Sequence, residues 1–188
     1  GSMWTVPDVR RRLKELKTRG GKLLVVDPRR TETAELASEH LFIKPGSDAA
    51  FLLAVLHVLF RDDLVAPGAL AAFTDGLSEV GEAVAELTPS WAAELTGIAA
   101  DEIERIAHEF SDAPSAICYG RMGVSTQAFG ALCQWAILLI NVATGNLDKP
   151  GGSLFALPAM DQVANTNPGG FGRFASRGRG LPEFNREL

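Results

Sequence analysis

Two adjacent arginines follow a short apolar run and are suited to bind phosphate. They belong to the segment Asp27-Pro28-Arg29-Arg30-Thr31, which comes directly after the apolar residues 23–26. A guanidinium group can place two parallel hydrogen bonds on a phosphate, and free N–H groups at the start of a following helix would add donors. The alternative is that both arginines are ordinary surface charges. The segment is therefore a candidate anion site, and the motifs around it decide between these two interpretations.

A second candidate is the turn Pro45-Gly46-Ser47-Asp48, which lies between a predicted strand and a predicted helix. A carboxylate such as that of Asp48 can accept two hydrogen bonds from the N–H and amino groups of a guanine edge, a contact worth roughly 1–3 kcal/mol of discrimination between bases. Asp and Ser are also among the residues that cap helices best. A helix cap and a ligand contact are compatible, so both roles stay open for this turn.

The third candidate is the polar loop from Gly120 to Gln127. Glycines at a strand end let a flat ligand approach the backbone closely. The side chains of Ser125, Thr126 and Gln127 offer hydrogen-bonding groups that suit a heterocycle. The alternative is an ordinary glycine-rich turn that Ser125 or Thr126 caps.

No other pattern in the sequence predicts a catalytic or metal-binding group. The G-x-S-x-G nucleophile elbow, the Walker A loop and the G-x-G-x-x-G fingerprint do not occur. The three histidines, His40, His57 and His108, lack metal-ligand spacing, and His57 in an apolar run is expected to pack in the core or at an interface. Cys118 and Cys133 are likewise expected to be small core residues. We therefore expect no catalytic and no metal-ligating residue.

The spacing of apolar residues, glycines and prolines predicts the elements that position these motifs. Leu23–Val26 shows no polar alternation, which is typical of a parallel strand covered on both faces, and Ser115–Gly120 has the same character. Further elements are predicted as helices at about 7–19, 31–38, 47–60, 101–110 and 128–144, short helices between 67 and 100, and a strand at 40–44. Together they predict a three-layer α/β domain with a Rossmann-like parallel sheet and a helical insertion around residues 65–112.

Composition sets the broad class. The chain has 188 residues, a net charge of −5 and 46% hydrophobic residues, which is enough for one domain with a core. The acidic balance argues against nucleic acid as a partner, and no apolar run reaches the about 18–20 residues that span a membrane. Residues 1–3 resemble the remnant of an expression tag. Residues 4–150 are expected to form the domain, and residues 151–188, rich in Gly, Pro and Arg, a poorly ordered connecting segment.

The three motifs occur together, in an order that resembles the molybdopterin oxidoreductases of the dimethyl sulfoxide reductase superfamily. The resemblance lies in Val25–Ala34, in Pro45–Ala50, in Gly123–Gln127, in Asn141, in Thr144–Asp148 and in Pro150–Gly152. It covers nearly the whole chain after the first three residues, and its character is most similar to that of formate dehydrogenase-like catalytic subunits.

In that family a molybdenum or tungsten ion is held by two pterin guanine dinucleotides, so the resemblance implies a bis-molybdopterin guanine dinucleotide cofactor. The resemblance assigns a group of cofactor-binding residues to each part of the ligand. The guanosine and phosphates are assigned Asp27, Pro28, Arg29, Arg30 and Thr31. The guanine is assigned Gly46, Ser47 and Asp48, and the pterin is assigned Met122, Gly123 and Gln127. At the last position the family varies, so Thr126 is the alternative to Gln127.

The resemblance also implies parts that this sequence does not contain: the iron–sulfur cysteines, the metal ligand and the domain that completes the second dinucleotide site. We therefore expect a central piece of a larger molybdenum-dependent oxidoreductase, inactive by itself, whose partners are the remaining domains and the electron-transfer subunits of the parent enzyme. Electrons would leave through iron–sulfur clusters outside this piece. The alternatives are a stand-alone nucleotide-binding or regulatory α/β module without redox activity, and a structural interaction domain.

Overall fold

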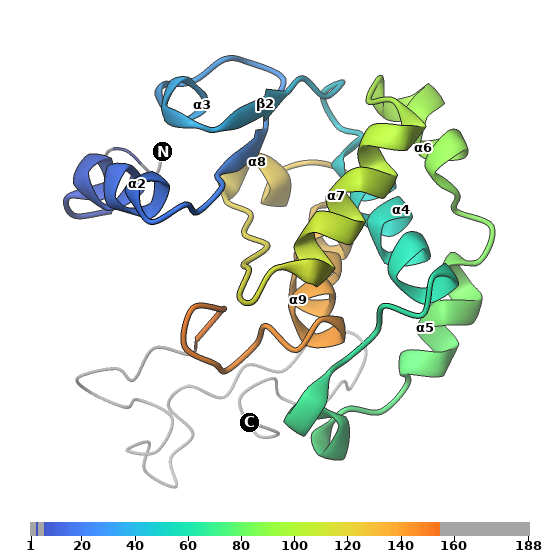
Figure 1. Ribbon diagram of the computed structural model, residues 1–188. Helices are drawn as coiled ribbons and strands as arrows, with labels where there is room; N and C mark the ends of the chain where they lie inside the picture. Colours follow the sequence, from blue (N-terminus) through green and yellow to red (C-terminus); the bar gives the residue numbers. More distant parts are fainter. Residues whose placement is uncertain (1–2, 4–5, 155–188) are drawn as a thin grey trace, which may run out of the picture. The chain divides into compact units, whose positions relative to one another are not determined.

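A computed structural model describes Met3 and residues 6–154, which are mainly helical around a small parallel sheet (Figure 1). The strands are β1 (Leu24–Val26) and β2 (Glu39–Leu41). The helices are α2 (Val9–Thr18), α3 (Glu32–Leu36), α4 (Asp48–Arg61), the 3-10 helix η1 (Gly68–Phe73), α5 (Leu77–Val84), α6 (Pro89–Thr96), α7 (Ala100–Asp112), α8 (Met122–Ser125) and α9 (Gly130–Ala143).

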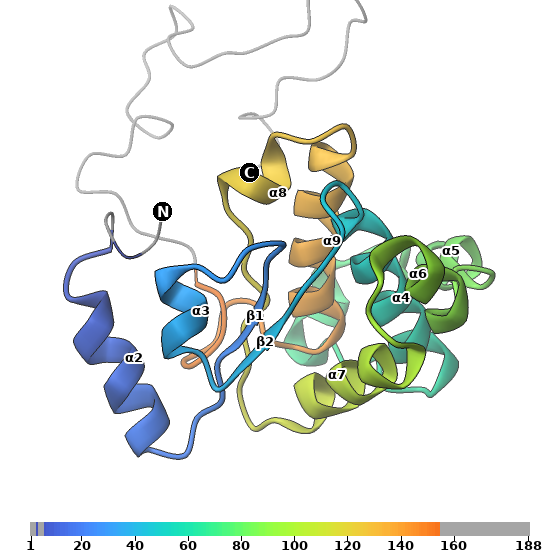
Figure 2. The ribbon, with the colours of Figure 1, turned by 90° about the horizontal axis from the view of Figure 1, so that it is seen from above.

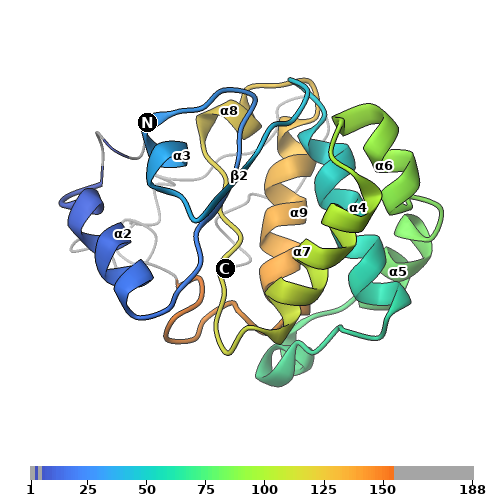
Figure 3. The ribbon, with the colours of Figure 1, turned by 45° about the horizontal axis from the view of Figure 1, so that its top comes forward.

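The strands β1 and β2 pair in parallel, with Leu24 opposite Glu39 and Val26 opposite Leu41. The amide of Asp27 continues the ladder by donating to the carbonyl of Leu41 over 3.1 Å. Figure 3 shows α2 and α3 on one side of this sheet and α4, α7 and α9 on the other. The sheet packs against the hydrophobic core through three of its side chains, Leu24, Val26 and Leu41.

The helix α4 lies at the centre of the core, because its side chains are apolar on nearly every side. Leu56, Val58 and Leu59 are completely buried, and α4 packs against α5, α6, α7 and α9. Burying a side chain of this size contributes about 1.5–3 kcal/mol. His57 is buried in the same helix, where its Nδ1 atom lies 2.9 Å from the carbonyl oxygen of Val84 in α5. This confirms the prediction of a core histidine.

The helices predicted between residues 65 and 112 are present as η1, α5, α6 and α7. The hydroxyl of Thr88 caps α6 by accepting the amide of Trp91 over 3.2 Å. Gly97 ends this helix with a φ of 78°, a left-handed conformation that glycine adopts without strain. The helix α7 buries Ile103 and Ile106 against the core. Within the described part of the chain, none of the helices has the length and apolar character that crossing a bilayer requires.

The strand predicted at Ser115–Gly120 is wrong, because this extended segment pairs with neither described strand. Two buried asparagines take the place of a neighbouring strand. Asn141 donates from Nδ2 to the carbonyl of Cys118 over 2.8 Å and accepts the Cys118 amide at Oδ1 over 2.9 Å. Asn146 accepts the amide of Ala116 at Oδ1 over 3.1 Å. Since a side-chain amide carries the same donor and acceptor as a peptide group, the segment is held along α9 and the turn after it.

The fold class is therefore a mainly helical α/β unit. The described residues contain a sheet of two strands, whereas the sequence predicted a three-layer Rossmann-like sheet. The tag remnant expected at residues 1–3 and the connecting segment expected at residues 151–188 lie outside the described residues, apart from Met3 and residues 151–154.

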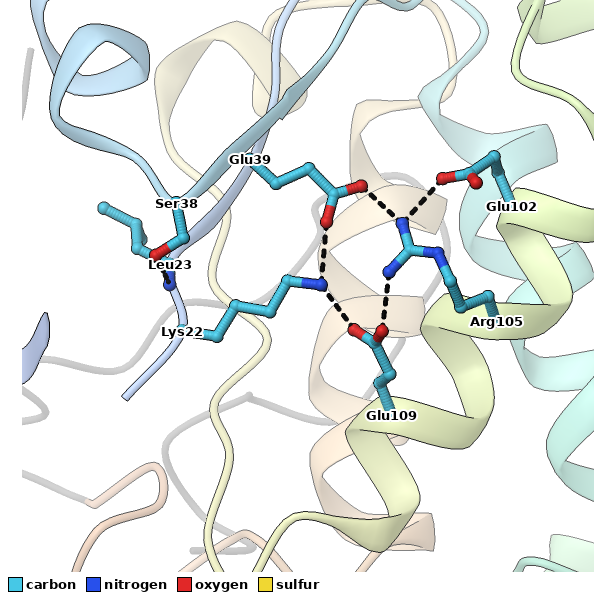
Figure 4. Close-up of polar contacts among 7 residues, drawn as sticks. All are labelled: Lys22, Leu23, Ser38, Glu39, Glu102, Arg105 and Glu109. Carbon is cyan, nitrogen blue, oxygen red and sulfur yellow. Dashed lines mark hydrogen bonds and ion pairs between the residues drawn. The ribbon is translucent and has the colours of Figure 1, made fainter. Parts of the chain in front are cut away.

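Five charged side chains join the sheet to α7 (Figure 4). Lys22, just before β1, lies 2.7 Å from a carboxylate oxygen of Glu39 in β2 and 2.6 Å from one of Glu109 in α7. Arg105 of α7 contacts Glu109 over 2.7 Å and also pairs with Glu39 and Glu102. Hydrogen bonds from Lys22 and then from Arg105 lower the pKa of Glu109. Because these side chains are partly exposed, the network orients the sheet more than it stabilises the fold.

Replacing Asn141 by leucine should destabilise the chain strongly. The variant leaves the N–H and C=O groups of Cys118 without their partners, and each unpaired buried group costs about 1–3 kcal/mol. We expect the free energy of unfolding, measured by urea denaturation, to fall by about 2–4 kcal/mol. Gln134→Leu on the same helix is the control, because the one described partner of the Gln134 amide is the hydroxyl of Ser125. Equal effects of the two variants would contradict the bracing role of Asn141.

Replacing Arg105 by glutamine should lower Tm at pH 7 by about 2 °C and by less at about pH 3.5. The pKa of Glu109 is lowered in the folded chain, so its ion pairs stabilise the fold above its ordinary pKa of 4.5 and lose that effect as the pH falls. Arg12→Gln is the control, because Arg12 pairs with no described residue. A Tm difference of the same size at both pH values would show that Glu109 contributes nothing.

Candidate functional site

The three sequence motifs gather at one end of the described unit. Because β1 and β2 are parallel, the residues that follow them lie at the same edge of the sheet. Figure 2 and Figure 3 show the loops after both strands at this end, together with α8 and the start of α4. We call residues 27–31 loop 1, residues 45–48 loop 2 and residues 121–127 loop 3. The carboxyl ends of parallel strands are where open α/β sheets bind ligands.

Loop 1 is held by contacts of its backbone and of Asp27. The Oδ1 atom of Asp27 accepts the amide of Arg29 over 2.8 Å, and the Nε2 atom of His40 lies 3.1 Å from the Asp27 carbonyl oxygen. Thr31 caps α3, since its hydroxyl accepts the amide of Ala34. The side chains at the tip of the loop are exposed: Pro28, Arg29 and Arg30. Neither arginine bonds another described side chain, so both guanidinium groups can reach a ligand.

Loop 2 turns the chain from β2 into α4 and places Asp48 in the first helical turn. Gly46 has a φ of 82°, which favours glycine, and the space beside its Cα is open for at least 4 Å. Ser47 occupies the cap position, but its hydroxyl donates to the carbonyl of Lys44 over 2.6 Å. The Asp48 carboxylate instead points to loop 3. Its negative charge is favourable at the positive end of the α4 dipole.

Loop 3 contains the single turn of α8 and carries an amide toward loop 2. The Nε2 atom of Gln127 donates to Oδ2 of Asp48 over 2.9 Å and to the carbonyl of Gly123 over 3.3 Å. The Oε1 atom of the same amide is buried and has no hydrogen-bond partner. Met122 is 68% exposed, and the space beside Gly123 is open. The hydroxyl of Thr126, the alternative contact residue, donates to the Met122 carbonyl over 2.8 Å.

The structure thus brings loops 2 and 3 into contact, although Asp48 and Gln127 are 79 residues apart in sequence. It links neither of them to loop 1 by a hydrogen bond or ion pair between described residues. The family resemblance assigns Asp48 and Gln127 to different parts of a ligand, and the separate motifs do not predict their direct contact.

The two cysteines near the site have thiol pKa values above the ordinary range. Burial raises the pKa of the Cys118 thiol to about 12. Burial, and after it the negative charge of Asp48, raises the pKa of Cys133. Because the thiolate is the nucleophile and the metal ligand, both cysteines are neutral side chains at neutral pH. The second shift also indicates that Cys133 lies close to Asp48, a proximity that no sequence motif predicts.

Two further residues support the site, although the sequence motifs assign neither of them a role in it. His40 contacts the backbone of loop 1, and Asn141 holds the extended segment that leads into loop 3. Asn141 did leave a signal in the sequence. A polar side chain in the middle of an apolar helix must find hydrogen-bond partners there, which predicts a buried bracing contact without naming its partner.

This chain belongs to the molybdopterin oxidoreductase family. A family model described as "Molybdopterin oxidoreductase" matches residues 4–177. The match covers most of the chain, including all three loops and α9.

The chain is similar to several characterised members of this kind. It is 34% identical to formate dehydrogenase H from Escherichia coli (strain K12) over 144 residues, which are 77% of this chain and 20% of that protein. It is 30% identical to trimethylamine-N-oxide reductase from Vibrio parahaemolyticus, with 88% of this chain and 22% of that protein covered. The structure of acetylene hydratase from Pelobacter acetylenicus superposes with a TM-score of 0.68 at 30% identity, over 73% of this chain and 19% of that chain. The chain therefore spans about a fifth of the length of these relatives.

Gly130→Ala should disturb loop 3, whereas Gly123→Ala should not. A Cβ atom at residue 130 would lie 2.0 Å from the carbonyl oxygen of Ser125, while the space at residue 123 is open. Because the clash is with backbone, we expect Gly130→Ala to lower the free energy of unfolding by about 1–3 kcal/mol and to move the NMR amide signals of loop 3. If both variants unfold at the same urea concentration as the unmodified chain, loop 3 does not pack against the start of α9 as described.

Proposed function

We propose that this chain holds one guanine dinucleotide arm of a molybdenum cofactor within a molybdopterin-dependent oxidoreductase. The observation that carries the proposal is the Asp48 carboxylate at the start of α4, whose Oδ2 atom is occupied by Gln127. Its Oδ1 atom bonds no described residue. A fixed carboxylate with an available oxygen suits the adjacent N–H groups of a guanine edge.

The chemistry of loops 1 and 3 fits the rest of such a ligand. The exposed guanidinium groups of Arg29 and Arg30 suit its phosphates. The open space beside Gly46 and Gly123 would let a flat ring system lie against the backbone. In this proposal Pro28 and Thr31 shape loop 1, Ser47 fixes the turn before Asp48, and Met122 covers an apolar part of the ligand.

The whole protein would then be a two-electron oxidoreductase similar to formate dehydrogenase. The metal of the bound cofactor would supply the redox chemistry, and iron–sulfur clusters elsewhere in the protein would carry the electrons. The chain's own residues would bind and orient the dinucleotide, and the chain alone would catalyse no turnover. The remaining domains and electron-transfer subunits would be its partners. The three-layer sheet expected from the sequence also belongs to this proposal.

The proposal is tested by titrating the purified chain with guanosine diphosphate and following its backbone amide signals by NMR. We expect the signals of loops 1, 2 and 3 to move, and adenosine diphosphate to bind more weakly. Asp48→Ala should weaken guanosine diphosphate binding about tenfold or more, because a hydrogen bond to a charged group is worth roughly 1.5–3 kcal/mol.

The matched control is Asp101→Ala, which removes a first-turn carboxylate from α7 instead of α4 and should leave the affinity unchanged. Equal binding of the two nucleotides, or signal changes confined to α5, α6 and α7, would refute the proposed site.

A further inference from the structure

We propose that Gln127 is a specificity-determining residue of this site, which orients Asp48 and accepts a second hydrogen bond from the exocyclic amino group of the bound base. This inference rests on the proposed function, because it concerns the ligand that Asp48 would hold. It goes beyond that function by joining Asp48 and Gln127 in one subsite, where the sequence motifs had assigned them to different ends of a dinucleotide.

The orientation of the Gln127 amide is fixed by its neighbours. Both groups that its nitrogen contacts, the Asp48 carboxylate and the Gly123 carbonyl, are acceptors. A rotated amide would place Oε1 against these two oxygens and lose both hydrogen bonds. The nitrogen therefore faces Asp48 and Gly123, and Oε1 faces the other way. This contact ties the carboxylate of loop 2 to the backbone of loop 3, so Asp48 cannot rotate without breaking it.

The same geometry leaves an acceptor without a donor. Oε1 of Gln127 is buried and unpaired, and such an atom costs about as much free energy as a lost hydrogen bond. Asp48, which the amide nitrogen contacts, offers a further carboxylate oxygen to which no described residue donates a hydrogen bond. With the donors of the amide used up, the pair presents hydrogen-bond acceptors only.

An acceptor-only pair selects a base edge with adjacent donors. Guanine offers N1–H next to an exocyclic amino group with two hydrogens, which can serve Asp48 and Gln127 together. Hypoxanthine has the same ring N–H but lacks the amino group, and adenine places a ring acceptor beside its amino group. The predicted order of affinity is therefore guanosine, inosine and adenosine diphosphate, and Gln127 should contribute to the step between the first two.

Because Oε1 is buried in the free chain, binding must move the surrounding side chains enough to admit a donor. The side-chain amide signals of Gln127 should therefore shift when guanosine diphosphate binds, and they should shift less with inosine diphosphate. A residue that only stabilises loop 3 would respond equally to both nucleotides.

The deciding experiment compares the affinities of the purified chain for guanosine and inosine diphosphate by calorimetry, with and without Gln127→Met. Methionine has a similar size and no hydrogen-bonding amide. We expect the ratio of the two affinities to fall about fivefold in the variant, the effect of one lost hydrogen bond. Gln134→Met is the matched control, because Gln134 bonds Ser125 and not Asp48, and it should keep the full ratio.

The possible outcomes separate the two proposals. If the unmodified chain binds guanosine diphosphate no better than adenosine diphosphate, the proposed function fails and this inference fails with it. If the unmodified chain prefers guanosine diphosphate and Gln127→Met keeps the full ratio to inosine diphosphate, only the role of Gln127 is overturned. Should the methionine variant fail to fold, Gln127→Asn provides the same test, since its shorter amide cannot reach Asp48, and an unchanged ratio would again overturn the inference.

Discussion

Burial of α4 is the constraint on which the rest of this structure depends. The helix is apolar on nearly every side and is enclosed by α5, α6, α7 and α9. A helix with no polar face cannot slide or rotate without exposing large side chains to water. Its first residue, Asp48, is therefore fixed at the edge where β2 ends. The helical layer surrounds α4, and the candidate site lies where α4 begins.

Side-chain amides supply hydrogen bonds that the two-stranded sheet does not provide. Asn141 and Asn146 hold the extended segment before α8 in the way that a neighbouring strand would. Gln127 then joins the end of that segment to the start of α4. These amides lie within α9 or close to its ends in the sequence. The packing of α9 in the core therefore fixes where loop 3 lies. Such a contact favours one arrangement of the segment, because leaving a buried amide unpaired costs more free energy than the hydrogen bond contributes.

Much of this arrangement is predictable from local sequence, and the exceptions have a common cause. The cap at Thr31, the buried His57 and the helices between residues 65 and 112 follow from residue type and apolar spacing, and all are present. Ser115–Gly120 has the composition of a buried strand, yet it pairs with side chains. No local pattern reveals which groups lie across from a segment. The Asp48–Gln127 contact is not predictable from local sequence for the same reason, since it joins residues far apart in the chain. The roles of loops 1, 2 and 3 in binding a cofactor remain predictions.

Membership in the molybdopterin oxidoreductase family and the convergence of three polar loops at one sheet edge support a common account. In that account Asp48, oriented by Gln127, recognises the guanine end of a dinucleotide, while loop 1 binds its phosphates. The most direct test is an experimental structure of the whole protein with its cofactor bound. The account predicts a guanine base within hydrogen-bond distance of both the Asp48 carboxylate and Oε1 of Gln127. A guanine bound elsewhere, with Asp48 covered by polypeptide, would contradict it.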